Sequence, residues 1–211
     1  MPGAVVIGAG PGIGRAVARR FAREGLPVAL ISRSASVDVD AELALVADST
    51  DADALRTALD KATEQFGLPD VVVYNAALVR ADALGELSVR EHTDAWAVNV
   101  VGAAVAAAHV LPAMARRGSG SFLITGGMPD AKPEYVSLSL GKAGVRTLIS
   151  LLDKQFGASG VRVASVTVDG GVVPGTAFDP DRIAEHYWWL HANPADRRLE
   201  VLFTGQSPGG A

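Results

Sequence analysis

The chain has 211 residues, of which 49% are hydrophobic and 20% charged, and this composition suits one globular domain with a sizeable core. Its formal net charge is −4 with both signs interspersed, so no basic patch points to nucleic acid or to an anionic membrane as a partner. The absence of cysteine excludes disulfides and thiolate metal sites. The first residues lack the basic and apolar segments of a signal peptide, and we expect a single cytoplasmic domain over 1–211.

Short β-branched runs alternate with longer helical stretches along the chain. This alternation predicts a doubly wound α/β fold, in which a seven-stranded parallel sheet carries helices on both faces. The expected strands are 4–7, 28–32, 43–46, 71–74, 121–125, 162–168 and 200–203. The expected helices are 13–24, 52–66, 90–117, 134–156 and 181–191, and a glycine follows each of the first four as a stop signal.

Two stretches depart from the regular pattern. Only about ten residues separate Arg33 from the third expected strand, which is short for a crossover. This connection is either a helix of one or two turns or an irregular loop, and we favour a shortened crossover. The longest apolar stretch, 95–114, is interrupted by Asn99, His109 and Pro112, which favours a buried helix over a membrane span.

A glycine-rich turn joins the first strand to the first helix, and it contains Gly8, Pro11, Gly12, Ile13 and Gly14. Glycine permits tight turns and close backbone approach, and a helix N-terminus presents free N–H groups and a positive dipole end. At the first strand–helix junction of an α/β chain, such a turn is suited to hold the pyrophosphate of a dinucleotide. The alternative is a purely structural turn.

The glycine spacing resembles the G-x-x-x-G-x-G turn of the short-chain dehydrogenase/reductase family, and the similarity extends from residue 4 to about residue 204. It implies a Rossmann-type sheet. The stretch 96–102 resembles the central helix of that family, which implies that Asn99 is the active-site asparagine. The resemblance also implies cofactor contacts after the third and fourth strands, from Asp48, Ser49, Asn75, Ala76 and Ala77.

The end of the second strand indicates which cofactor binds. In this fold an acidic residue there would hydrogen-bond the ribose 2′-OH of NAD and repel the 2′-phosphate of NADP. The strand ends in Ser32 and Arg33, and no acidic residue follows before Asp38. A guanidinium at this position can pair with a phosphate or stack on adenine, so NADP(H) is expected in preference to NAD(H). The alternative is that Arg33 is a solvated surface side chain.

The catalytic pattern of the family is incomplete in this chain. Members use Ser, Tyr and Lys together with the asparagine, and the tyrosine acts as acid or base four residues before the lysine. Lys142 matches the family lysine, but Leu138 stands where the tyrosine is expected. Near the end of the fifth strand, Thr125 is the one residue that could offer the serine hydroxyl.

Tyr135 is the candidate to replace the missing acid. It lies seven residues before Lys142, so a helix starting at 134 would place both on nearly the same face, about 10 Å apart along the axis. In that position Tyr135 could donate the proton that a carbonyl oxygen needs. The alternative is a packing residue at a helix N-terminus.

The segment after the sixth strand resembles the family loop that covers nicotinamide, which implies cofactor contacts from Val172 and Val173. The stretch 178–193 resembles a mobile substrate lid, and 205–211 reads as a frayed tail. His186 and His191 lack a third ligand at a suitable spacing, so no metal is expected.

Two functions are compatible with these residues. The first is an NADP(H)-dependent oxidoreductase that acts on a small carbonyl or alcohol substrate. The second is an NADP(H)-binding protein without hydride transfer, either a scaffold, a sensor or a non-redox enzyme. The helices expected at 90–117 and 134–156 have more apolar surface than one small domain can bury, so we also expect a homodimer or homotetramer.

Overall fold

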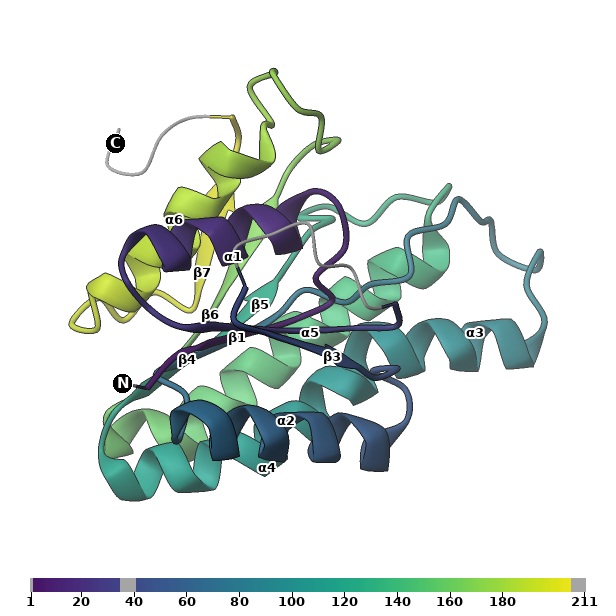
Figure 1. Cartoon of the computed structure of the whole chain (residues 1–211). Coiled ribbons are helices and arrows are strands. Elements are labelled where there is room, and N and C mark those ends of the chain that lie inside the picture. Colours follow the sequence, from purple (N-terminus) through teal and green to yellow (C-terminus); the bar gives the residue numbers. More distant parts are fainter. Residues whose placement is uncertain (1, 35–40, 206–211) are drawn as a thin grey trace.

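The computed structural model describes residues 2–34 and 41–205 and contains one seven-stranded parallel sheet in the order β3-β2-β1-β4-β5-β6-β7 (Figure 1). The predicted doubly wound sheet is therefore confirmed. The chain starts at β1 in the middle of the sheet, runs outward to β3 and then returns to β4 on the other side of β1. The strands are β1 (Ala4–Ile7), β2 (Val28–Ser32), β3 (Leu43–Val46), β4 (Val71–Tyr74), β5 (Gly120–Thr125), β6 (Val161–Val168) and β7 (Glu200–Phe203).

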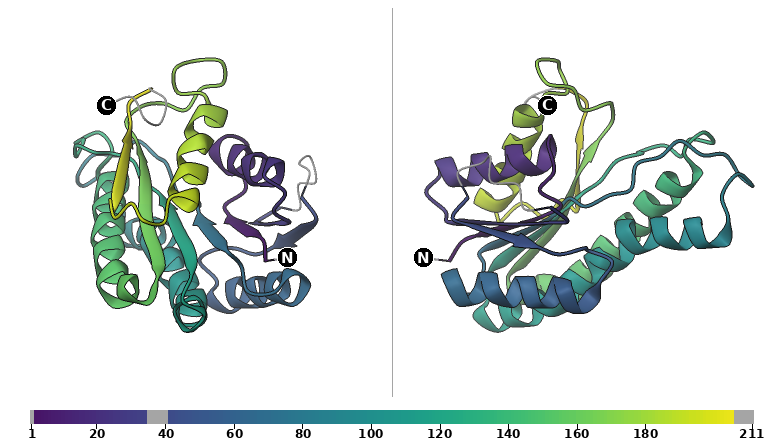
Figure 2. Two further views of the ribbon diagram at one scale, coloured as in Figure 1. Left: turned by 90° about the vertical axis from the view of Figure 1, so that its left-hand side faces the viewer. Right: turned by 45° about the vertical axis from the view of Figure 1, so that its right-hand side comes forward.

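Helices cover both faces of the sheet (Figures 1 and 2). On one face pack α1 (Ile13–Arg23) and α6 (Pro180–Ala192). On the other face pack α2 (Ala52–Phe66), α4 (Gly102–Arg117) and α5 (Val136–Phe156), which is followed by the short 3₁₀ helix η2 (Gly157–Ser159). Burial of both sheet faces explains why the central strands consist almost entirely of apolar residues.

One long helix contains a π-helical turn. The α-helix α3 (Val89–Trp96), the π-helix η1 (Ala97–Val101) and α4 form a continuous run over Val89–Arg117. Its length and its mean hydropathy of 1.7 over 18 residues would suffice to cross a membrane, but half of that window is buried inside the protein. This burial agrees with the predicted core helix. The π turn carries Asn99, and such turns often lie at functional sites.

The helix α6 lies in the stretch 178–193 that the sequence assigned to a lid, and its apolar side packs into the core. Tyr187 and Leu190 are fully buried in the cluster that also contains α1. Arg19 pairs with Asp181 at 2.7 Å, and Arg20 pairs with Glu185 at 2.8 Å, so salt bridges fasten the same two helices together. An amphipathic helix with aromatic residues fits a core layer as well as a lid, and the sequence alone did not distinguish the two.

Three expectations lie wholly or partly outside the described residues: the shortened crossover between β2 and β3, the acidic residue Asp38 and the tail over 205–211. The crossover and Asp38 involve residues 35–40, and the tail involves residues 206–211. The two strands that the connection joins pair in parallel register, from Ala29 opposite Leu43 to Ser32 opposite Val46.

Gly102 lets the long helix approach the sheet closely. A Cβ built on Gly102 would overlap the Tyr74 hydroxyl and would lie 2.6 Å from the Ser49 carbonyl oxygen. We expect Gly102→Ala to lower the free energy of unfolding by about 1–3 kcal/mol, because the backbone at Ser49 cannot yield without moving the end of β3. Urea denaturation would measure this. Gly171→Ala is the control, since no atom lies within 4 Å of a Cβ there, and an equal loss in both variants would contradict the steric explanation.

Candidate cofactor and active site

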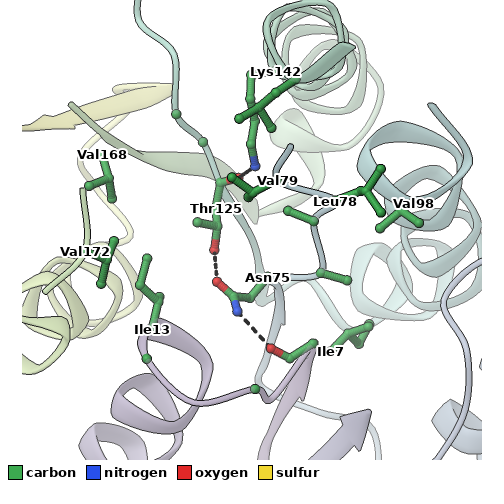
Figure 3. Close-up of a pocket in the computed structure, with 18 of the residues that line it drawn as sticks. Ile7, Ile13, Asn75, Leu78, Val79, Val98, Thr125, Lys142, Val168 and Val172 are labelled. Carbon is green, nitrogen blue, oxygen red and sulfur yellow. Dashed lines mark hydrogen bonds between the residues drawn. The ribbon is translucent and has the colours of Figure 1, made fainter. Parts of the chain in front are cut away.

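A cavity of about 1030 Å³ lies along the carboxyl ends of the central strands. Its walls include the glycine-rich turn before α1, the ends of β2, β4, β5 and β6, and the N-terminal end of α5 (Figure 3). It lies where the chain changes direction between β1 and β4, which is the place where ligands bind in open α/β sheets. The cavity therefore joins the predicted pyrophosphate turn to the predicted catalytic lysine.

The glycine-rich turn has the shape expected of a phosphate cradle. Gly8 has φ = 84°, and a Cβ there would lie 2.6 Å from the Cα of Ala76. Gly12, with φ = 109°, is the N-cap of α1, and no side chain caps the helix there. A Cβ on Gly12 would meet no atom within 4 Å, so open space lies at the uncapped helix N-terminus. Pro11 and Ile13 also line the cavity.

A chain of hydrogen bonds links this turn to β5 (Figure 3) and continues from β5 to α6. The Asn75 amide donates to the Gly8 carbonyl at 2.8 Å, and the Thr125 hydroxyl donates to the Asn75 amide oxygen at 2.7 Å. Thr125 has a single proton to give, so its 2.7 Å bond with Tyr187 must be donated by the Tyr187 hydroxyl. The Thr125 hydroxyl is therefore already engaged on the α6 side of the sheet. Ala76 and Ala77, which follow Asn75, also line the cavity.

The residues predicted to hold the adenosine end lie together. Ser32, Arg33, Asp48 and Ser49 all line this part of the cavity, and Arg33 is exposed. Hydrogen bonds from the Thr50 amide and hydroxyl, together with the Arg33 charge, hold the pKa of Asp48 below its ordinary value. Asp48 is therefore an anion beside a cation at this end of the cavity.

Asn99 supports the cavity from behind. It is buried, and its amide oxygen accepts a 3.0 Å bond from the Leu78 N–H. A Cβ on Gly141 would lie 2.8 Å from the Asn99 Cβ, so only glycine allows α5 to pack this closely on the π turn. Leu78 lines the cavity and Asn99 does not, so Asn99 acts on the site through the backbone after β4.

Lys142 is the buried charged residue of the cavity wall. Its ammonium donates to the Thr125 carbonyl at 2.7 Å (Figure 3). Burial, and to a smaller degree the charge of Arg146, lower its pKa to about 8. Leu138 stands one turn earlier, buried and facing the same cavity. Gly127 lies on the other side, where a Cβ would be 3.7 Å from the Lys142 Cε. Neither neighbour offers a hydroxyl.

Tyr135 lines the cavity from a position that the sequence did not predict. The helix α5 begins at Val136, so Tyr135 is its N-cap with φ = −143° and ψ = 54°. The predicted start at 134 is wrong, and the seven-residue spacing does not put Tyr135 and Lys142 on one helical face. Tyr135 is half-buried, and its hydroxyl has no hydrogen-bond partner among the described residues.

The sequence analysis did not single out Arg146, which also contributes to the site. Arg146 donates to the carbonyls of Gly127 at 3.2 Å and Met128 at 3.1 Å, which anchors the loop after β5. Its spacing of four residues from Lys142 was the available clue. Val172 lines the cavity as predicted, whereas Val173 lies outside the wall and donates its N–H to the Phe178 carbonyl.

Of the two histidines considered for a metal, His186 is buried and His191 is half-buried. His191 bonds to the Ser121 hydroxyl at 3.0 Å, and His186 packs edge-on against Phe203. Within residues 2–34 and 41–205, no group of three or more His, Cys, Asp or Glu side chains is arranged to hold a metal ion.

The strand order and the cradle at its switch point define a Rossmann-type nucleotide-binding domain. Residues 3–179 match the family described as short chain dehydrogenase, and the chain belongs to this family of oxidoreductases. The cis-4-hydroxycyclohexanecarboxylate dehydrogenase of Sinomonas cyclohexanicum is 33% identical over 191 residues, 84% of this chain and 74% of that protein. The oxidoreductase UcpA of Escherichia coli K12 is 30% identical over 77% of this chain and 66% of its own length.

A solved structure extends the likeness to the whole fold. It is the alcohol dehydrogenase of the archaeon Thermococcus sibiricus complexed with 5-hydroxy-NADP. The two structures superimpose with a TM-score of 0.85 over 99% of each chain, at 28% sequence identity.

The lowered pKa of Lys142 can be tested directly, because the chain has four lysines. In protein labelled with ¹³Cε-lysine, one NMR resonance should titrate near pH 8, since burial and Arg146 disfavour the ammonium form. Lys142→Met should remove that resonance, and Lys132→Met, which changes an exposed lysine of the same cavity, should leave it in place. A Lys142 midpoint at the ordinary lysine value would contradict the environment described here.

Proposed function

We propose that the protein is an NADP(H)-dependent oxidoreductase that interconverts a small carbonyl compound and its alcohol. The observation that carries this proposal is one continuous cavity whose wall contains both the glycine-rich turn and the buried Lys142. The names of its relatives support it, since one is a dehydrogenase of a hydroxycyclohexane carboxylate and another is an alcohol dehydrogenase complexed with a modified NADP.

The residues present fit a dinucleotide. The turn at Gly8, Gly12 and Gly14 offers an uncapped helix N-terminus and open space for a pyrophosphate. Arg33 and Ser32 would hold a 2′-phosphate, and Asp48 would lie near the adenine. When bound, the nicotinamide supplies or accepts the hydride. Lys142 would hold the nicotinamide ribose, since its ammonium has one protein acceptor and two further protons to donate.

During reduction, the carbonyl carbon receives the hydride and the carbonyl oxygen receives a proton. We assign the proton to the Tyr135 hydroxyl, which lines the cavity and carries no competing hydrogen bond among the described residues. Thr125 is less suited, because its proton is already donated to Asn75. Asn99 would keep Leu78 and the backbone after β4 in place around the substrate.

Cofactor choice gives one test. NADP(H) should bind more tightly than NAD(H), and Arg33→Ala should narrow that difference by about 1–3 kcal/mol, because the guanidinium would lose its phosphate. Isothermal titration calorimetry would measure both affinities. Arg90→Ala, in an exposed part of α3, is the control that should change neither. Equal or tighter binding of NAD(H) by the unaltered protein would refute the assignment.

The proton donor gives a second test. Tyr135→Phe should lower turnover by roughly 10²–10⁴-fold, the usual worth of a general acid, while NADP(H) affinity stays nearly unchanged. Lys142→Ala should impair both turnover and cofactor binding. NADPH absorbance with a panel of carbonyl compounds would measure turnover. Full activity of Tyr135→Phe would move the proton source to Thr125, to residues 178–193 or to water.

A second function deserves the same experiment. Leu138 and Gly127 flank Lys142, so no hydroxyl lies at the place one turn before the lysine where the family has its tyrosine. This arrangement favours a protein that binds NADP(H) without hydride transfer, as a scaffold, a sensor or a non-redox enzyme. Tight NADP(H) binding without turnover of any carbonyl in the panel would establish that function instead.

We also propose that the protein assembles as a homodimer or homotetramer through its long helices. Trp96 and Val101 on the α3–η1–α4 run and Leu140 and Leu151 on α5 are exposed apolar side chains. Light scattering at micromolar concentration should give at least twice the 21.7 kDa chain mass. Leu151→Glu should shift the equilibrium toward the monomer, because it would bury a charge in the interface. A monomeric unaltered protein would refute the proposal.

A further inference from the structure

Asp82 is a buried carboxylate in an otherwise exposed segment. Its side chain is 2% exposed, whereas both its neighbours are exposed and Leu84 is 85% exposed. Figure 2 shows that the loops after β4 and β5 extend together beyond the sheet, above α3 and the start of α5. Burying a carboxylate there is costly unless strong partners compensate for the lost water.

The partners of Asp82 lie at the start of α5. One carboxylate oxygen accepts the Ser137 hydroxyl at 2.7 Å, and the other accepts the Ser137 N–H at 2.9 Å. Tyr135, the N-cap residue, makes no side-chain cap of its own. Asp82 therefore caps the helix from 55 residues away in the chain, and its charge faces the positive end of the helix dipole.

The backbone of Asp82 also holds Tyr135 from both sides. The Asp82 N–H donates to the Glu134 carbonyl at 3.0 Å, and the Val136 N–H donates to the Asp82 carbonyl at 3.0 Å. These two bonds form an isolated parallel bridge between Asp82 and Tyr135. Asp82 thus makes four hydrogen bonds to the residues on either side of Tyr135. One bond goes to Glu134 before it, and three go to Val136 and Ser137 after it.

The charges around Asp82 keep it ionised. Burial raises its pKa, but the two bonds from Ser137, together with the charges of Arg80 and His92, outweigh burial and lower the pKa below its ordinary value. Arg80 also pairs with Glu91 at 3.4 Å, and Glu91 belongs to the capping box of α3. The clamp is therefore present across the neutral pH range.

Asp82 is absent from the cavity wall, whereas Tyr135 forms part of it. We propose that Asp82 is a positioning residue, whose carboxylate and backbone clamp Tyr135 at the N-terminus of α5 so that its phenol forms part of the cavity wall. The consequence for catalysis rests on the proposed reductase function, whereas the clamp itself does not.

The clamp can be observed without any turnover, because the chain has three tyrosines. Tyr74 and Tyr187 are buried, and burial raises the pKa of Tyr74 to about 12 and that of Tyr187 further. In protein labelled with ¹³Cζ-tyrosine, Tyr135→Phe assigns the third resonance. We expect Asp82→Ala to shift or broaden the Tyr135 resonance and to leave those of Tyr74 and Tyr187 unchanged.

Matched variants separate the clamp from general stabilisation. Asp51→Ala removes another N-cap carboxylate, that of α2, and should lower stability without moving the Tyr135 resonance. Asp82→Asn keeps an oxygen for the Ser137 N–H and should have a smaller effect than Asp82→Ala. If Asp82→Ala does not fold, Ser137→Ala removes one of the four bonds and should shift the same resonance. An unmoved Tyr135 resonance in a folded Asp82 or Ser137 variant overturns the proposal.

Turnover then tests the catalytic consequence. Asp82→Ala should lower kcat by about 10–100-fold, the effect of a misplaced group, with little change in KM for NADPH. In a Tyr135→Phe background the same substitution should have no further effect on kcat, because the two residues act in series. Additive losses would overturn the positioning role. If Tyr135→Phe alone is fully active, the proposed proton donor is wrong, and the tyrosine resonance alone decides whether the clamp exists.

Discussion

The contact between the glycine-rich turn and the segment after β4 determines where the rest of the site can lie. Gly8 has a positive φ and approaches the backbone of Ala76 so closely that no side chain fits between them. The Asn75 amide bonds the Gly8 carbonyl across this contact. The start of the first helix, the loop after β4 and the end of β5 are thereby held together at this contact. The cavity extends from it along the carboxyl ends of the strands.

Further along the cavity, the buried cation Lys142 has no carboxylate partner within residues 2–34 and 41–205. Its ammonium is held by a backbone carbonyl, and the positive charge of Arg146 acts on it. A salt bridge would have kept the ammonium strongly charged and occupied its protons. A single carbonyl acceptor leaves the Lys142 ammonium with further protons to donate and with a pKa closer to neutrality. The pKa of Lys142 is therefore set by burial more than by ion pairing.

The sequence predicted the sheet well because the central strands β1, β2, β4, β5 and β6 are buried on both faces, which leaves short apolar runs with clear ends. It also located the glycine turn, Asn75 and Lys142, because each lies in a short segment that resembles a family motif. It failed where distant residues decide the structure. Asp82 fixes the start of α5 and so the place of Tyr135, and the core packing of Tyr187 makes α6 a structural layer. Asn99 was predicted to act at the site, but its contact with Leu78 puts it one layer behind the cavity wall. Arg33 remains a prediction, since only a bound phosphate distinguishes a ligand from a solvated side chain.

The hydrogen bonds from Tyr187 through Thr125 and Asn75 to Gly8 have a consequence for the order in which the site can form during synthesis. A nascent chain that has emerged through β5 already contains the glycine turn, Asn75 and Thr125, but the last donor of the series follows 62 residues later. Until α6 docks on α1, the Thr125 hydroxyl lacks the bond that Tyr187 donates to it. The hydrogen-bond series that begins at the glycine turn near the N-terminus therefore receives its last donor only from α6, so it cannot be complete in a nascent chain that has not yet folded α6 onto α1.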